Sequence, residues 1–154
     1  MQKITPFLWF ESSAKEAADF YLSVFGEGSR TIDQSILHNT PSGAVEIITL
    51  LLRGQEFTLM SAGPFKKFNE AISFVISCEN QEEVDHYWEK LSVVDEAVQC
   101  GWLKDKYGVS WQVVPTILTT LLKDEDKEKA GRVMQAMLQM KKIEIQALED
   151  AYNA

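Results

Sequence analysis

Two cysteines are the first side chains in this sequence that could carry out chemistry. Cys78 and Cys100 are separated by other secondary-structure signals, so they form neither a disulfide framework nor a zinc-ligand set. Cys100 could act as a nucleophile, but no histidine lies near it in the sequence to activate the thiol. A cysteine in a strand is more often a small, inert core residue, and that interpretation is favoured here.

The two histidines are the next candidates. His38 lies at the end of an expected strand beside a Pro/Gly loop, and His86 lies in the middle of an expected helix. Neither has another histidine or a carboxylate at metal-ligand spacing on a shared face. Both are therefore predicted to be surface residues rather than ligands.

One carboxylate, Glu46, stands inside an apolar run between Val45 and Ile47. In a strand its side chain points to the face opposite these two neighbours, and that face is either solvent or a binding cleft. In a cleft, Glu46 could serve as a general base or bind a ligand amine. The sequence leaves both alternatives open.

Three tryptophans, Trp9, Trp102 and Trp111, lie in expected strands. Their indole rings could stack on a planar ligand, although burial in the core is the commoner role for each. We retain Trp9 and Trp102 as candidate ligand-binding residues.

An internal repeat organises the elements that must position these residues. Residues 4–10 and 72–77 are apolar runs that fit strands, and residues 14–25 and 81–92 follow them with helical spacing of apolar side chains. A shift from Phe7 to Phe74 also places Phe20-Tyr21 on Tyr87-Trp88. The matched aromatic pair favours duplication of one unit.

Strand-like segments follow each helix, joined by short loops with turn residues such as residues 39–43 and 53–55. They cover residues 30–37, 45–53 and 56–61 in the first half and residues 97–103 and 109–114 in the second. The prediction is an α+β fold of two βαβββ modules, about residues 1–65 and 66–116, forming one concave, mostly antiparallel sheet. Concave sheets of this kind commonly hold small ligands. Together with the tail, the modules are expected to make a single domain over residues 1–154.

A helical tail is expected over about residues 117–152, after a charged run at residues 123–129. Its apolar residues recur at helical spacing and trace one stripe, interrupted only by Lys141: Met134, Met137, Ile145, Leu148 and Tyr152. Packing on its own domain and contact with a second copy both remain open, since methionine-rich faces adapt well to interfaces.

Composition limits the partners. The chain has 154 residues, of which 45% are hydrophobic and 25% charged, as in an ordinary globular domain. Its formal net charge of −8 disfavours nucleic acid and anionic lipid surfaces. No apolar run approaches the roughly 20 residues of a membrane span, and the first residues do not resemble a secretory signal. A cytoplasmic protein is expected.

Several motifs together resemble one family. They are residues 4–10, the Phe20-Tyr21 helix, the run from Cys100-Gly101-Trp102 to Ser110-Trp111-Gln112, and the tail residues 132–137. This pattern is similar to the PhnB-like group of the glyoxalase, bleomycin-resistance and dioxygenase superfamily, also called vicinal oxygen chelate proteins. Its members often carry the label 3-demethylubiquinone-9 3-methyltransferase. The resemblance implies paired βαβββ modules and a homodimer. One departure is the segment before Gln99, residues 92–97, which lacks the glycines that the group leads us to expect.

The resemblance also implies four positions for metal ligands on cleft-facing strands. In this chain they fall near Pro6, near Met60 or Ser61, near Ser73, and on Gln112. Only Gln112 has a plausible donor, and a single neutral amide does not hold Zn²⁺, Ni²⁺ or Fe²⁺. We therefore expect no bound metal and no cofactor.

The resulting hypothesis is a metal-free module that binds a small molecule, with catalysis left open. Its candidate cleft residues are Trp9, Glu46, Met60, Trp102 and Gln112. The first alternative is a metal-dependent lyase or dioxygenase of glyoxalase type. The second, a methyltransferase, is disfavoured because residues 11–14 after the first strand contain no glycine for a cofactor-binding turn.

Overall fold

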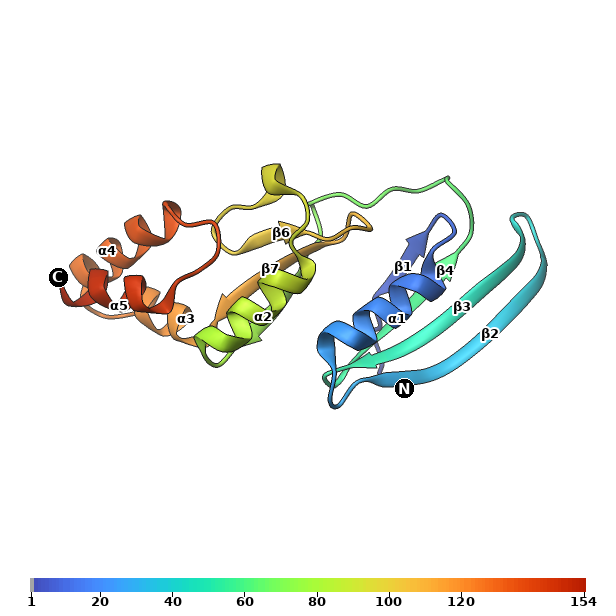
Figure 1. The fold of residues 1–154 in the computed structure, drawn as a ribbon, viewed down its shortest axis with the longest axis horizontal. Coiled ribbons are helices and arrows are strands. Elements are labelled where there is room, and N and C mark those ends of the chain that lie inside the picture. The colour runs from blue at the N-terminus through green and yellow to red at the C-terminus, as the bar shows by residue number, and fades with distance from the viewer. Residues whose placement is uncertain (1) are drawn as a thin grey trace. The chain divides into compact units, whose positions relative to one another are not determined.

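The structure is a computed structural model that describes residues 2–154. The chain divides into two compact units, Met1–Lys67 and Phe68–Ala154, and each is described by itself (Figure 1). Both units combine strands with helices, which confirms the α+β fold class.

Unit 1 is a complete βαβββ module. Its elements are β1 (Phe7–Phe10), α1 (Ala14–Phe25), β2 (Arg30–Thr40), β3 (Gly43–Leu52) and β4 (Gln55–Ser61). The four strands form one sheet in the order β1-β4-β3-β2, in which β1 and β4 are parallel and the other pairs are antiparallel. The sequence therefore placed every element of this unit correctly in kind and order.

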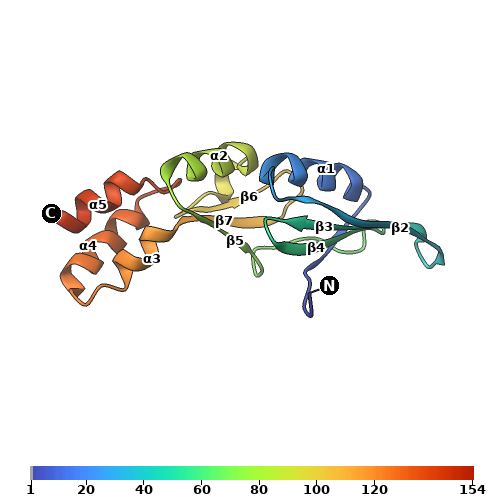
Figure 2. The ribbon, with the colours of Figure 1, turned by 90° about the horizontal axis from the view of Figure 1, so that it is seen from below.

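Helix α1 covers one face of the unit 1 sheet. Alternate residues of β3 are buried, namely Ile48, Leu50 and Leu52, and α1 packs on β3 and β4 through its own buried face. The period of two in the strands and the spacing of Ala17, Tyr21 and Val24 in the helix explain this layer. Among residues 2–67, no helix lies on the opposite face of the sheet (Figure 2).

Unit 2 repeats the arrangement with one strand fewer. Its first elements are β5 (Phe74–Cys78), α2 (Gln81–Leu91), the 3₁₀ turn η1 (Asp95–Ala97), β6 (Trp102–Lys104) and β7 (Ser110–Pro115). The sheet order is β5-β7-β6, with β5 parallel and β6 antiparallel to β7. Asn80 starts α2, because its side chain accepts a hydrogen bond from the Glu83 N–H.

The strand expected over residues 97–103 is mostly absent, which corrects that part of the prediction. Only an isolated bridge between Gln99 and Trp102 precedes β6. The intervening N–H groups of Cys100 and Gly101 donate instead to the carbonyl groups of Met140 and Lys141. The backbone thus leaves the sheet to bind the C-terminal segment.

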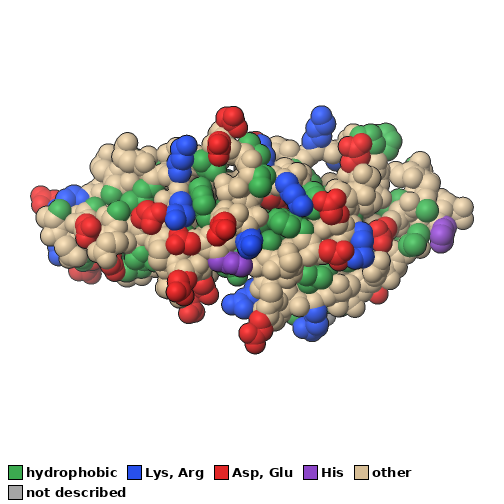
Figure 3. All heavy atoms as spheres, in the orientation of Figure 1, with side chains coloured by type: hydrophobic (Ala, Val, Ile, Leu, Met, Phe, Trp, Pro, Cys, Tyr) green, Lys and Arg blue, Asp and Glu red, His purple; other side chains and the backbone are tan. Residues whose placement is uncertain are grey.

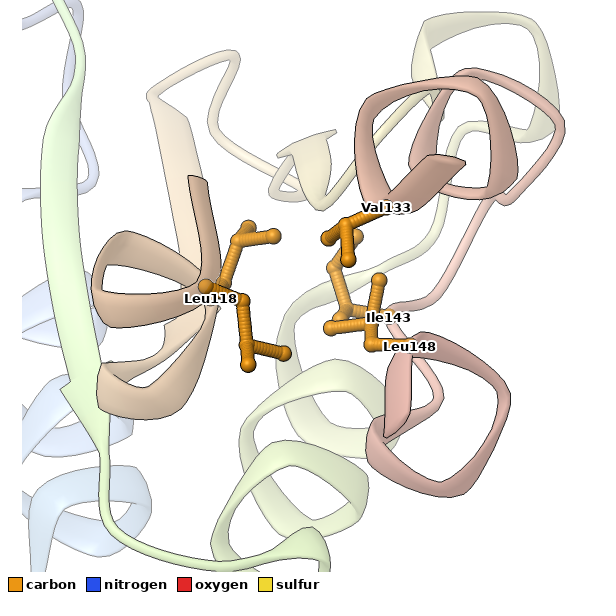
Figure 4. Packing of buried hydrophobic residues seen from close by; sticks show 5 residues of the cluster. Leu118, Val133, Ile143 and Leu148 are labelled. Carbon is orange, nitrogen blue, oxygen red and sulfur yellow. The ribbon is translucent and has the colours of Figure 1, made fainter. Parts of the chain in front are cut away.

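The C-terminal tail also differs from the prediction. It consists of three helices, α3 (Thr116–Leu122), α4 (Lys127–Leu138) and α5 (Ile145–Asn153), rather than one long helix. They enclose a core formed by Leu118, Leu121, Val133, Ile143 and Leu148. Figure 4 shows Leu118, Val133, Ile143 and Leu148 pointing toward one another. Met137 and Tyr152 of the expected stripe pack against this core, whereas Met134 is exposed.

Long-range hydrogen bonds explain why the helix breaks after Leu138. The Gln99 side-chain amide donates to the Leu138 carbonyl at the end of α4. The Gln81 amide donates to the Ile143 carbonyl, and its oxygen accepts from the Ile145 N–H at the start of α5. Side chains distant in sequence therefore satisfy the free helix ends.

Residues 2–154 include no helix with the length and apolar character needed to cross a bilayer. Acidic and basic side chains are interspersed over the side of the molecule seen in Figure 3. His38 and His86 are both exposed, as the sequence predicts.

Candidate functional site

Within residues 68–154, α2 covers one face of the unit 2 sheet and no helix covers the other (Figure 2). Leu103, Trp111 and Val113 are buried on the α2 side. Because neighbouring residues alternate, Trp102 of β6 and Gln112 of β7 point to the helix-free face. These two residues are direct cross-strand partners, and Val75 of β5 is the next partner in the same row. Trp102 is 37% exposed and Val75 is 57% exposed, so the row is an accessible surface with apolar groups on either side of an amide.

A polar row lies beside it on the same face. The Gln112 side-chain amide donates to the Ser73 hydroxyl over 2.9 Å. Ser110 of β7 is paired with Lys104 of β6, whose ammonium group binds the carboxylate of Glu70. The hydrogen bond that Lys104 donates to Glu70 is the main reason that the pKa of the Glu70 carboxyl lies below its usual value.

Two further candidates, Trp9 and Met60, lie side by side on the helix-free face of the unit 1 sheet. Trp9 of β1 and Met60 of β4 are cross-strand partners, and Ile47 of β3 continues their row. The Trp9 indole N–H donates to the Gly63 carbonyl over 2.8 Å, so it fixes the segment that follows β4. Trp9 therefore has a structural role in addition to its place on this face.

Within unit 1, Glu46 lies on a different face of the sheet from Trp9 and Met60. It is aligned with Ser61, whose hydroxyl accepts a hydrogen bond from the Ala14 N–H at the start of α1. Glu46 thus lies on the face that α1 covers, at its margin, and its carboxylate accepts from the Gln34 amide. Met60 and Trp9 point to the opposite face.

Asp105 is a buried polar residue that the sequence analysis overlooked. Its side chain is 1% exposed and accepts hydrogen bonds from the Tyr107 N–H, the Val109 N–H and the Trp111 indole N–H. The signal available in the sequence was the Asp105-to-Gly108 spacing of a tight turn. These bonds organise the β6–β7 hairpin and place Trp111 in the core.

The two cysteines differ in burial, and we expect them to differ in reactivity. Burial, assisted by the nearby Glu83, raises the pKa of the Cys78 thiol to about 12, whereas Cys100 is partly exposed. Thiolate is the reactive form, so at pH 8 a disulfide reagent should modify one thiol per folded chain and two in guanidinium chloride. Cys100→Ser should remove the fast-reacting thiol. Rapid modification of that variant while it remains folded would contradict this assignment.

The residues at the four positions implied for a metal do not fit one. Pro6 has no donor side chain, and Met60 offers only a thioether. The Ser61 hydroxyl accepts from the Ala14 N–H, and the Ser73 hydroxyl accepts from the Gln112 amide. Among residues 2–154, no three His, Cys, Asp or Glu side chains lie together in an arrangement able to hold a metal ion. The side chains at these four positions thus lack the carboxylate, imidazole or thiolate groups that bind divalent metal ions.

Solved structures have the same fold. The chain is 35% identical to a PhnB protein from Bacillus cereus, described as a 3-demethylubiquinone-9 3-methyltransferase, with a TM-score of 0.64 over 75% of this chain and 100% of that one. Protein PA1353 from Pseudomonas aeruginosa is 18% identical, with a TM-score of 0.54 over 75% of this chain and 98% of that one. The fosfomycin resistance protein FosX from Listeria monocytogenes is 17% identical, with a TM-score of 0.54 over 80% and 98%. No functionally curated protein matches the chain.

These similarities identify a protein of the vicinal oxygen chelate superfamily, with glyoxalase-like βαβ modules. The family model described as 3-demethylubiquinone-9 3-methyltransferase matches residues 2–114. The chain therefore belongs to this PhnB-like family.

Proposed function

We propose that this protein is a metal-free module that binds a small molecule on the helix-free face of unit 2. The pairing of Trp102 with Gln112 on that face carries the proposal. A partly exposed indole offers a flat apolar surface, and an adjacent amide offers both a donor and an acceptor. Ligand sites commonly combine such surfaces with a few polar groups.

The side chains at the implied metal-ligand positions favour a metal-free binding protein over a metal-dependent lyase or dioxygenase of glyoxalase type. Those chemistries need carboxylate or imidazole ligands, whereas the corresponding positions here include Pro6, Ser73 and Gln112. The hydrogen bond from the Gln112 amide to Ser73 fixes the orientation of the Gln112 side chain, whose oxygen is then available to accept a hydrogen bond from a ligand.

The family description names a methyltransferase, but the fold gives that activity little support. Rossmann-type enzymes that bind S-adenosylmethionine have a glycine-rich turn after the first strand of a mostly parallel sheet. In this chain Glu11, Ser12 and Ser13 follow β1, and β1 has only one parallel neighbour, β4. We include S-adenosylmethionine among the ligands to be tested.

The proposed working form is a cytoplasmic homodimer in which the whole chain acts as one glyoxalase-like domain. Strand β2 supports the dimer, because it is an edge strand of 11 residues with exposed Ile32, Ile36 and Leu37. Long edge strands with apolar side chains favour pairing with another chain. Sedimentation equilibrium tests this proposal, and a monomeric mass at micromolar concentration would contradict it.

The binding proposal predicts ligand binding without metal. Protein exposed to Zn²⁺, Ni²⁺, Mn²⁺ and Fe²⁺ and freed of excess ion should retain far less than one equivalent per chain by elemental analysis. A thermal-shift screen of small aromatic molecules should then find ligands whose effect persists in EDTA. At a hundred times its dissociation constant, such a ligand adds about 2.7 kcal/mol, which is about 5–10 °C for a chain of this size.

Two variants control the screen. Trp102→Ala should abolish the ligand-induced shift, whereas Val93→Ala, at another exposed apolar residue of unit 2, should leave it unchanged. One retained equivalent of metal together with metal-dependent turnover would overturn the proposal in favour of a metal-dependent enzyme.

A further inference from the structure

Three polar residues form a row on the helix-free face of unit 2. The register of β5 on β7 aligns Phe74 with Trp111, so Ser73, one residue earlier, lies beside Ser110. On the other side of Ser110 lies its partner Lys104 in β6. This polar row, Ser73-Ser110-Lys104, is adjacent to the row that contains Gln112 and Trp102.

Ser110 is the unusual member of the polar row. It is 3% exposed, and within residues 2–154 its hydroxyl is the buried side-chain group without a hydrogen-bond partner. A buried hydroxyl without a partner is costly, and native structures rarely leave one unless it has a ligand or another role. Ser73 can also donate a further hydrogen bond, since its oxygen accepts from Gln112 and its own O–H is left to donate.

Lys104 indicates which kind of ligand group the polar row can bind. Its ammonium group binds the carboxylate of Glu70, a residue of the segment that precedes β5. The Lys104 side chain is 26% exposed, whereas that of Glu70 is 64% exposed, so the carboxylate is held at the surface. An ion pair this exposed contributes little to stability, and another carboxylate can replace it.

We propose that the polar row binds the carboxylate of a small organic acid whose planar apolar part lies on Trp102. The acid replaces Glu70 at Lys104, and its second oxygen accepts hydrogen bonds from the Ser110 and Ser73 hydroxyl groups. Lys104 and Trp102 are two residues apart in β6 and share a face, so one small molecule spans both. This inference rests on the proposed function and specifies the class of its ligand.

Isothermal titration of the full-length protein with 2-naphthoate and its neutral isostere 2-naphthamide tests the inference. The acid should bind at least about tenfold more tightly than the amide, a factor that corresponds to about 1.4 kcal/mol. Lys104→Met should remove this preference. Glu70→Gln should strengthen binding of the acid several-fold, because a competing carboxylate is lost.

Ser110→Ala gives a signature that a purely structural serine would not give. Removing an unpaired buried hydroxyl should leave the melting temperature unchanged or raise it, yet binding of 2-naphthoate should weaken several-fold. Lys142→Met is the matched control, since Lys142 is 30% exposed and binds Asp85 and Glu144 away from the polar row. This variant should bind the acid normally.

The outcomes separate the two proposals. Equal binding of acid and amide, both abolished in Trp102→Ala, would overturn the carboxylate inference and leave the binding module standing. Binding of neither probe at millimolar concentration, or equal effects of Lys104→Met and Lys142→Met, would also overturn the inference. A stoichiometric retained metal required for turnover would instead overturn the proposed function.

Discussion

Replacing Gly101 with alanine is expected to destabilise the protein by about 3 kcal/mol, the sum of a backbone and a packing cost. Gly101 has a φ of +84°, and this left-handed conformation costs other residues about 1–2 kcal/mol. A Cβ atom there would lie 2.8 Å from the Val113 carbonyl oxygen and 3.2 Å from the Ile143 side chain. Overpacking of this kind typically costs about 1–3 kcal/mol. The carbonyl belongs to β7 and has little freedom to move.

The effect should extend beyond the glycine itself, because Gly101 joins the sheet to the C-terminal helices. Its N–H donates to the Lys141 carbonyl and its carbonyl accepts from the Val113 N–H. The neighbouring Cys100 N–H binds the Met140 carbonyl. Urea unfolding followed by circular dichroism measures the loss, and limited proteolysis should cut Gly101→Ala faster between α4 and α5.

Gly131 provides the control for this prediction. It lies on the exposed surface of α4, has an ordinary helical φ, and a Cβ atom there would meet nothing within 4 Å. Gly131→Ala should therefore stabilise the protein by about 0.5–1 kcal/mol through helix propensity. Equal unfolding midpoints for the two variants would refute the role assigned to Gly101.

The connection between Gly101 and the C-terminal helices shows which parts of the fold sequence patterns can predict and which they cannot. In unit 1, turn residues and a change in the spacing of apolar residues, from a period of two to one of 3.6, are local signals. They predicted β1 to β4 and α1 in the right order. The course of residues 97–103 depends on hydrogen bonds to Met140 and Lys141, about forty residues away in sequence. The break between α4 and α5 depends likewise on Gln81 and Gln99.

For a similar reason, the sequence indicated the strand positions of the candidate site residues but not the faces on which they lie. Alternation along a strand placed Trp102 and Gln112 correctly as strand residues, and the register then made them partners on one face. Alternation alone does not say which face a helix covers, so Glu46 remained ambiguous until the α1 layer was known. Whether these residues bind a ligand remains a prediction.

Asp105 illustrates a residue whose importance the local sequence conceals. It stands between Lys104 and Lys106, a pattern typical of an exposed turn. Yet its carboxylate is buried and bonds two backbone N–H groups and the Trp111 indole within the hairpin. Buried charges are tolerated when they are fully hydrogen-bonded, and here the partners come from residues that follow Asp105 closely.

Asp105→Ala is accordingly expected to lower the free energy of unfolding by about 4 kcal/mol. The change leaves three N–H donors without this partner, and hydrogen bonds to a charged group contribute about 1.5–3 kcal/mol each before non-additivity. Asp105→Asn should cost less, about 2 kcal/mol, because one amide oxygen still accepts while the NH₂ group faces a donor. Urea denaturation monitored by tryptophan fluorescence and circular dichroism measures both losses.

A double-mutant cycle with Trp111→Phe isolates the indole contribution, since phenylalanine keeps a ring in the core without the N–H group. The Asp105→Asn penalty should be smaller in the Trp111→Phe background by about 1 kcal/mol. Asp85→Asn is the control, because Asp85 forms a partly exposed ion pair with Lys142. This substitution should lower the free energy of unfolding by less than about 1 kcal/mol. If Asp105→Ala were as mild as this control, the hairpin would be held by packing rather than by its buried carboxylate.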